Sequence, residues 1–267
     1  MDKRMTITIS AIYRYPVKGL SPETLGKVTL IPGRCLPHDR RFAVALPSTR
    51  FDPDRPEWLS KTHFVMLMRD EKLARLHTRF DGATDELMVE RDGKTVLREG
   101  LGDAVGRRRT GAFFDEFLSG EIEGPLRVVE APGHAFADAR RKPNATTDQY
   151  VSLINLASIA ALERSIGAPV APLRFRANVY FEGVPAWGEL DWLGSEITVG
   201  GARLRVISAI TRCAATQVNP ATAERDLDIV GGLQRGFGHN LMGIYAEVTE
   251  GGEIAAGDRI TIRPAGS

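Results

Sequence analysis

The sequence predicts a mainly β protein of the α+β class, built as two β-barrel-like domains with a few short helices. Apolar and polar residues alternate along many short segments, as they do in half-buried strands. Glycine pairs or an Asp-Gly pair separate neighbouring segments at hairpin spacing. Few segments of helical periodicity lie between them, which argues against a doubly wound parallel sheet. A chain of 267 residues has room for two modest domains.

Strands dominate the predicted first domain, residues 1–130. The period-two pattern predicts strands over residues 6–13, 28–31, 42–46 and 64–68. Shorter strands are expected over residues 73–80, 87–91, 95–97 and 126–129, with a hairpin turn at Asp92-Gly93. Four apolar residues on one face predict a helix over residues 112–118. The glycines of residues 100–106 lack the spacing of a dinucleotide fingerprint, so that segment is expected to be a loop.

The predicted second domain covers residues 131–267. Ser158 is a suitable N-cap for a helix that runs to Ile166 and ends at Gly167. Strands are expected over residues 177–181, 196–199, 203–207, 244–248 and 259–262. The glycine pairs at 200–201 and 251–252 predict the hairpin turns between them.

The charge balance excludes whole classes of partner. Lys and Arg number 35 and Asp and Glu 34, a net charge of +1, so no global field draws the chain to nucleic acid or to a membrane surface. Any anion must therefore be held by a local pocket. No segment approaches the roughly 20 apolar residues that span a bilayer. Two cysteines rule out a disulfide framework or a four-cysteine metal site within the chain, and we expect a cytoplasmic protein.

The candidate for chemistry is a lone cysteine at the end of an apolar strand. Cys213 follows Arg212 in a segment of small and polar residues that leaves through Pro220. A thiolate is a soft metal ligand, and an adjacent guanidinium favours the thiolate. The alternative is that Cys213 is a small buried apolar residue, which composition alone favours. Spacing does not decide between the two.

The motifs together resemble a known family. The second half is similar to the MOSC domain, the C-terminal domain of molybdenum cofactor sulfurases, at Phe175-Arg176-Ala177-Asn178, Thr211-Arg212-Cys213, Gln217-Val218-Asn219-Pro220 and Gly257-Asp258. The first half resembles the N-terminal β-barrel domain that precedes MOSC in the mitochondrial amidoxime-reducing component and its bacterial relatives, at Tyr15-Pro16-Val17-Lys18-Gly19-Leu20 and His38-Asp39-Arg40-Arg41-Phe42. The resemblance covers essentially the whole chain in the family's order.

The resemblance implies a molybdenum cofactor, that is, molybdenum bound by the dithiolene sulfurs of molybdopterin. Cys213 would be the protein ligand to the metal, and Thr211 and Arg212 would line the same site. The residues that match positions holding the phosphate and the pterin are Lys18, Arg40, Arg176 and Asn178. Guanidinium groups bind phosphate through paired donors, and lysine adds a point charge, so these residue types suit the task. Tyr245 would line the pocket, and Asp148 with Gln149 would stand where the chain enters it.

Two positions depart from the family's pattern. Gly19 stands where relatives often carry a cofactor-binding serine, and Lys61 stands where they usually carry arginine. No cysteine-rich ferredoxin domain follows residue 267, so a separate ferredoxin, cytochrome or flavoprotein is expected to supply electrons. Cys35 lies in a loop and is expected to be structural.

The function implied is an oxidoreductase, a molybdenum-cofactor-dependent N-reductase. Its substrates would be N-hydroxylated small molecules such as amidoximes, hydroxylamines and N-hydroxy bases. One alternative is a sulfur-carrier module in which Cys213 holds a persulfide, related to the pyridoxal-phosphate-dependent molybdenum cofactor sulfurases. The other is a non-catalytic cofactor-binding or scaffold protein, since a fold does not dictate an activity.

Overall fold

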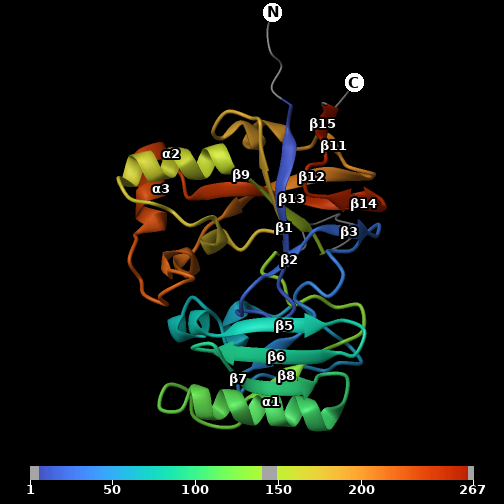
Figure 1. The fold of residues 1–267 in the computed structure, drawn as a ribbon, viewed down its shortest axis with the longest axis vertical. Helices are drawn as coiled ribbons and strands as arrows, with labels where there is room; N and C mark the ends of the chain where they lie inside the picture. The colour runs from blue at the N-terminus through green and yellow to red at the C-terminus, as the bar shows by residue number, and fades with distance from the viewer. Residues whose placement is uncertain (1–5, 140–148, 264–267) are drawn as a thin grey trace, which may run out of the picture.

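The computed structural model describes residues 6–139 and 149–263. Figure 1 shows two lobes, an upper one built on a large sheet with two helices and a lower one built on a small sheet with one helix. Among the described residues, strands outnumber helices, and the predicted mainly β fold is confirmed. None of the helices in these two ranges is both long enough and apolar enough to cross a membrane.

The upper lobe is organised by an eight-stranded sheet. Its strand order is β15-β11-β12-β13-β9-β10-β1-β2, with antiparallel pairing except between β9 and β10. The bounds are β1 Thr8–Arg14, β2 Glu23–Leu25, β9 Val151–Asn155, β10 Val179–Glu182, β11 Glu196–Val199, β12 Ala202–Thr211, β13 Leu241–Glu250 and β15 Ile260–Arg263. A separate pair joins β3 Lys27–Leu30 to β14 Gly252–Ala255.

Two apolar cores hold this sheet. One contains Ile12, Leu153 and Leu204 from three of its strands. The other packs α2, Leu156–Ile166, and α3, Ile229–Phe237, together and against β9 and β10. Burial of these side chains removes apolar surface from water and fixes the strand ends that reach the space between the lobes.

The lower lobe has its own core. Its three-stranded sheet comprises β5 His77–Asp81, β6 Glu86–Arg91 and β7 Lys94–Gly100. The helix α1, Ala104–Phe117, packs on β7 and on β8, Arg127–Val129, which pairs with β4, Ala43–Ala45. Short 3-10 turns complete the chain at Lys61–His63, Glu71–Arg75, Pro172–Phe175, Gly188–Trp192 and Ala214–Gln217.

The chain crosses between the lobes more often than a single linker would require. Strand β1 pairs with β10 in the eight-stranded sheet, and β3 pairs with β14 in a separate two-stranded sheet, so residues near the N-terminus pair with strands of the second half. The boundary near residue 130 stays a prediction. The pairing places strands from both predicted domains in one sheet, which brings residues 15–42 close to the second half.

Most strands and turns match the sequence pattern. At the hairpin between β6 and β7, Asp92 and Gly93 have φ of 53° and 73°, the left-handed pair that a type I′ turn requires. The predicted strand over residues 64–68 is wrong: Phe64 makes one bridge to Ala45, and a turn follows. The Asp70 carboxylate accepts a hydrogen bond from the Met66 amide at 3.0 Å, so a side chain takes the donor that a sheet would have used.

The helices begin earlier than the sequence pattern predicted. Strand β7 ends at Gly100, and α1 begins at Ala104, because the Asp103 carboxylate accepts from the amides of Val105 and Gly106, so residues 100–106 are not all loop. For α2 the N-cap is Asn155 rather than Ser158. The Ser158 hydroxyl instead donates to the buried Glu189 carboxylate. Strand β9 and helix α3 were not predicted.

The start of α1 depends on a close approach that only glycine permits. A Cβ at Gly106 would lie 1.8 Å from the Gly100 carbonyl oxygen. We expect Gly106→Ala to lower the free energy of unfolding by about 1–3 kcal/mol, although alanine alone favours a helix. Gly26→Ala is the control, since nothing lies within 4 Å of a Cβ there. Urea denaturation measures both, and equal stability of Gly106→Ala and the parent chain would contradict the contact.

Candidate functional site

A cavity of about 390 Å³ lies between the two lobes, within the range of small-molecule sites. Eight predicted site residues within the described ranges line it: Lys18, Arg40, Arg176, Asn178, Thr211, Arg212, Cys213 and Tyr245. Gln149 does not line it, and its side-chain oxygen accepts a hydrogen bond from the Cys35 amide at 3.4 Å. Asp148 lies outside the described residues. Gly19 and Lys61, the two departures from the family pattern, also line the cavity. Their roles as ligands stay predictions, but the residues converge on one space.

Cys213 stands at the wall of this cavity where β12 ends. The pairing of β12 with β13 shifts register at three places, the last between Ala209 and Thr211, and such irregularities re-aim side chains. The Cys213 carbonyl accepts from the amide and the hydroxyl of Thr216 at 3.1 and 2.9 Å, which begins a 3-10 turn. The thiol is half-buried, so Cys213 is not a fully enclosed apolar residue.

Arg212 fixes the backbone beside Cys213. Its Nε and Nη2 donate to the Met242 carbonyl at 2.9 and 2.6 Å, and Nη1 donates to the Phe175 carbonyl at 2.8 Å. Burial lowers the pKa of this guanidinium, but neighbouring tyrosines and Cys213 favour its charge. The two backbone carbonyls accept hydrogen bonds from Arg212, but they are neutral and supply no counter-charge to its positive charge.

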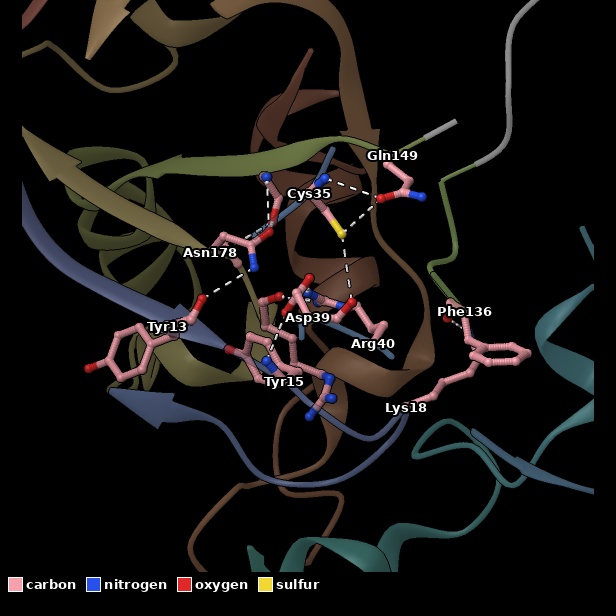
Figure 2. Close-up of polar contacts among 12 residues, drawn as sticks. Tyr13, Tyr15, Lys18, Cys35, Asp39, Arg40, Phe136, Gln149 and Asn178 are labelled. Carbon is pink, nitrogen blue, oxygen red and sulfur yellow. Dashed lines mark hydrogen bonds and ion pairs between the residues drawn. The ribbon is translucent and has the colours of Figure 1, made fainter. Parts of the chain in front are cut away.

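A second cluster of charged side chains surrounds the buried ring of Tyr15. The guanidinium of Arg40 lies 4.6 Å from the centroid of Tyr15 and that of Arg176 lies 4.4 Å from it. The Asp39 carboxylate accepts from the Tyr15 amide at 2.7 Å and pairs with Arg40 (Figure 2). Arg40 also donates to the Arg176 carbonyl at 2.8 Å, and Arg176 to the Leu20 carbonyl at 2.7 Å.

The two arginines on this ring differ in electrostatic state. Burial opposes the charge of Arg40, but Asp39 and Tyr15 outweigh it and raise its pKa. Burial, reinforced by Arg40, lowers the pKa of Arg176 despite Tyr15. Among the described residues neither Arg176 nor Arg212 forms an ion pair. Each is therefore a charge that an anion in the cavity would stabilise.

Lys18 reaches the cavity from the lower lobe. Its side chain is 8% exposed, and its ammonium donates to the Phe136 carbonyl at 2.9 Å and pairs with the Asp138 carboxylate. Burial lowers its pKa, and Asp138 opposes that effect. Figure 2 shows Lys18 extending to Phe136, on the far side of Arg40 from Asn178.

The charges that line the cavity do not balance. Among the described residues, two carboxylates, Asp39 and Asp138, line the cavity together with six cationic side chains: Lys18, Arg40, Lys61, Arg174, Arg176 and Arg212. Arg174 is neutralised from outside the cavity, by Asp226 at 2.6 Å. A surplus of buried positive charge remains, which suits a ligand that carries negative charge.

Some predicted residues serve the frame more than the cavity. The Asn178 side chain accepts from the amide and hydroxyl of Ser152 at 3.1 and 2.8 Å and donates to the Tyr13 carbonyl at 3.2 Å. It thus ties β1, β9 and β10 together. Tyr245 lies across from Tyr150, with ring centroids 6.1 Å apart, and burial raises its pKa.

Sequence reasoning missed Tyr15, Asp39 and Asp138 as parts of the site. Tyr15 and Asp39 stand inside the two motifs of the first half, next to residues that were predicted. Their tasks depend on contacts across the chain, between residues 15, 39, 40 and 176, which no local pattern reveals. Asp138 lies in a segment without hydrophobic periodicity, and no sequence signal marks it.

The two thiols differ in reactivity. Burial raises the pKa of Cys35 to about 12, so its thiol stays protonated at pH 8, whereas the Cys213 thiol is partly exposed. We expect iodoacetamide at pH 8 to label one cysteine of the chain prepared without a bound cofactor. Cys213→Ser should abolish the label and Cys35→Ser should keep it, as mass spectrometry will detect. Equal labelling of both cysteines would contradict this assignment.

Comparison with curated proteins connects the chain to one protein name. "Molybdenum cofactor sulfurase" of Caenorhabditis briggsae is 25% identical over 235 residues, which are 82% of this chain and 30% of that protein. The Caenorhabditis elegans protein of the same name is 28% identical over 159 residues, 58% of this chain and 20% of that protein. The chain therefore spans less than a third of the length of these relatives.

Solved structures and a family model complete the comparison. The YUAD protein from Bacillus subtilis is 16% identical, with 98% of both chains covered and a TM-score of 0.44. YiiM from Geobacillus stearothermophilus is 18% identical, covering 42% of this chain and 53% of that one, with a TM-score of 0.34. The family model described as the MOSC domain matches residues 133–261, the part that supplies Arg176, Arg212 and Cys213. Residues 133–261 of this chain are a MOSC domain.

Proposed function

We propose that this chain binds a molybdenum cofactor in the cavity between its lobes and reduces N-hydroxylated small molecules. One observation carries the proposal: a half-buried thiol, Cys213, faces the same cavity as a surplus of buried cations from both halves of the chain. A metal-binding thiol and an anion-binding pocket in one space suit a prosthetic group that carries both a soft metal and a phosphate. The MOSC domain and the names of the curated relatives support this choice.

The donor set fits such a group better than a metal ion held by protein alone. Within the described residues, no cluster of three or more histidine, cysteine, aspartate or glutamate side chains could hold a metal ion. Cys213 would be a single protein ligand, and the remaining ligands would come with the cofactor. A thiolate is the protein donor that best suits a soft or sulfur-bound metal.

The cationic side chains of the cavity suit the phosphate-bearing organic part of the proposed cofactor. Arg176 and Arg40 both lie against the Tyr15 ring and would offer guanidinium donors to a phosphate, and Lys18 would add a point charge. Arg212 spends its donors on the carbonyls of Met242 and Phe175, so it contributes charge and holds Cys213 in place. Thr211 and Tyr245 would border the space left for the substrate.

The proposed reaction consumes two electrons and two protons, converts the N–OH group to N–H and releases water. When bound, the cofactor would supply the two-electron redox chemistry. The chain's part is to hold the group, to limit water through the buried walls of the cavity, and to admit a small substrate beside Cys213. A separate ferredoxin, cytochrome or flavoprotein would deliver electrons, and two free thiols suit a reducing cytoplasm.

A second candidate is a sulfur carrier in which Cys213 holds a persulfide. The curated relatives favour it by name, since both are called molybdenum cofactor sulfurase. The partly exposed thiol beside Arg212 suits a persulfide as well as a metal. Mass spectrometry of the purified chain separates the two: an added sulfur on Cys213 without a bound pterin favours the carrier.

Removal of the thiol tests the enzyme directly. We expect Cys213→Ser to lower the rate of benzamidoxime reduction, with reduced methyl viologen as donor, by about a hundredfold or more, because the metal loses its protein ligand. Cys35→Ser is the matched control and should keep the activity. Full N-reductase activity in Cys213→Ser would end the proposal.

Loss of the Arg176 charge beside Tyr15 should weaken retention of the cofactor. We expect Arg176→Met to carry about tenfold less pterin after purification, measured by fluorescence of the oxidised pterin, because a charge-assisted pair of donors is lost. Arg176→Lys keeps the charge without the paired donors and should lie between Arg176→Met and the parent chain. Arg79→Met, on an exposed strand residue, should retain the parent's pterin content. Equal pterin in Arg176→Met and the parent would contradict the anion site.

A further inference from the structure

One carboxylate that lines the cavity, that of Asp138, occupies a cation which an anionic ligand would also contact. In the part of the chain that the structure describes, Asp39 and Asp138 are the acidic side chains that line it, and they are held differently. Asp39 has a side chain only 2% exposed and is fixed by the Tyr15 amide and Arg40. The Asp138 side chain is 53% exposed, and within the described residues its carboxylate is paired with Lys18 alone.

The segment that carries Asp138 is anchored without it. The Phe136 amide donates to the Arg40 carbonyl at 2.8 Å, and its buried ring packs on Phe51 and Phe64. Lys18 also donates to the Phe136 carbonyl at 2.9 Å. If the Asp138 carboxylate left, Lys18 would keep this hydrogen bond and the segment would keep its packing. Asp138 is therefore the exchangeable partner, and Phe136 is the fixed one.

An anion beside Lys18 favours the charged form of its ammonium. Burial lowers the pKa of the ammonium, and Asp138 counteracts that effect. Burial acts to raise the pKa of Asp138, but Lys18 and neighbouring cations outweigh it, so the carboxyl pKa lies below its ordinary value. The ion pair thus stabilises the charge of a buried ammonium, and a phosphate oxygen in the same place would do likewise.

We propose that Asp138 is a built-in competitor for the anion site: its carboxylate holds the Lys18 ammonium until a phosphate group displaces it. The inference rests on the anion site of the proposed function and adds how that site is kept charged and how its affinity is set. The displaced carboxylate is already half in solvent, so water stabilises it. The phosphate would gain Lys18 and Arg176, which has no carboxylate partner among the described residues.

The exchange has a signature that a purely structural ion pair lacks. Without the carboxylate, the ligand-free chain should be less stable, because a buried ammonium has lost its partner. The same change should strengthen the binding of an anion, because nothing competes for Lys18. If the Asp138 carboxylate only supported the fold, its removal would lower both the stability of the chain and its affinity for an anion.

The test is titration calorimetry of the full chain, prepared without cofactor, with inorganic phosphate at pH 8. We expect Asp138→Asn to lower the Kd for phosphate about tenfold, and Asp138→Ala to act in the same direction. Both variants should have a lower Tm than the parent in the absence of phosphate. Glu121→Gln is the matched control, since Glu121 pairs with Lys72 outside the cavity and is 49% exposed. It should leave the Kd unchanged.

Lys18→Met separates the two levels of the argument. If Lys18→Met weakens phosphate binding and the Asp138 variants leave it unchanged or weaker, the anion site stands and the competitor is refuted. If phosphate does not bind the parent, or binds equally to Lys18→Met, the anion site itself fails, and the competitor falls with it. Tighter binding in both Asp138 variants, together with weaker binding in Lys18→Met, supports the proposal.

Discussion

Two guanidinium groups share the ring of one buried tyrosine, and this arrangement governs the rest of the site. Arg40 and Arg176 lie 4.6 and 4.4 Å from the centroid of Tyr15, although like charges repel. The ring, the Asp39 carboxylate and backbone carbonyls stabilise them in part. Arg176 keeps no carboxylate of its own among the described contacts, so its charge is left for a ligand to complete. The charges of the described side chains therefore favour an anionic ligand, independently of any metal.

This arrangement depends on strand pairing between the two halves of the chain. Tyr15 and Arg40 come from the first half of the chain and Arg176 from the second, and β1 crosses to pair with β10 so that the halves meet. Asn178 ties β1, β9 and β10 together directly behind the cavity. Strand β12 then delivers Cys213 to the same space, with Arg212 binding the carbonyls of Met242 and Phe175 to hold it. The same pairings thus join the halves and bring the residues of the site together.

The local sequence pattern predicted the turns and strands that depend on neighbouring residues. It did not predict features that depend on contacts between residues far apart in the chain. The hairpin at Asp92-Gly93 follows from the backbone preference of two residues, and alternation located most strands. The apolar run at residues 64–68 looked like a strand because both of its sides are buried, and the Asp70 side chain turned it instead. Motif resemblance brought the cationic residues and Cys213 together correctly in one cavity. It could not reveal the contact of Arg176 with the Tyr15 ring or the pairing of Lys18 with Asp138, since those contacts span 161 and 120 positions of the chain.

The most direct measurement is a crystal structure of the protein purified from a host that makes molybdenum cofactor, with diffraction recorded on both sides of the molybdenum absorption edge. The account predicts one anomalous peak within bonding distance of the Cys213 sulfur, and a phosphate in contact with Arg176. A cavity with a bound anion but no metal at that sulfur, or a metal bound elsewhere in the chain, would contradict it.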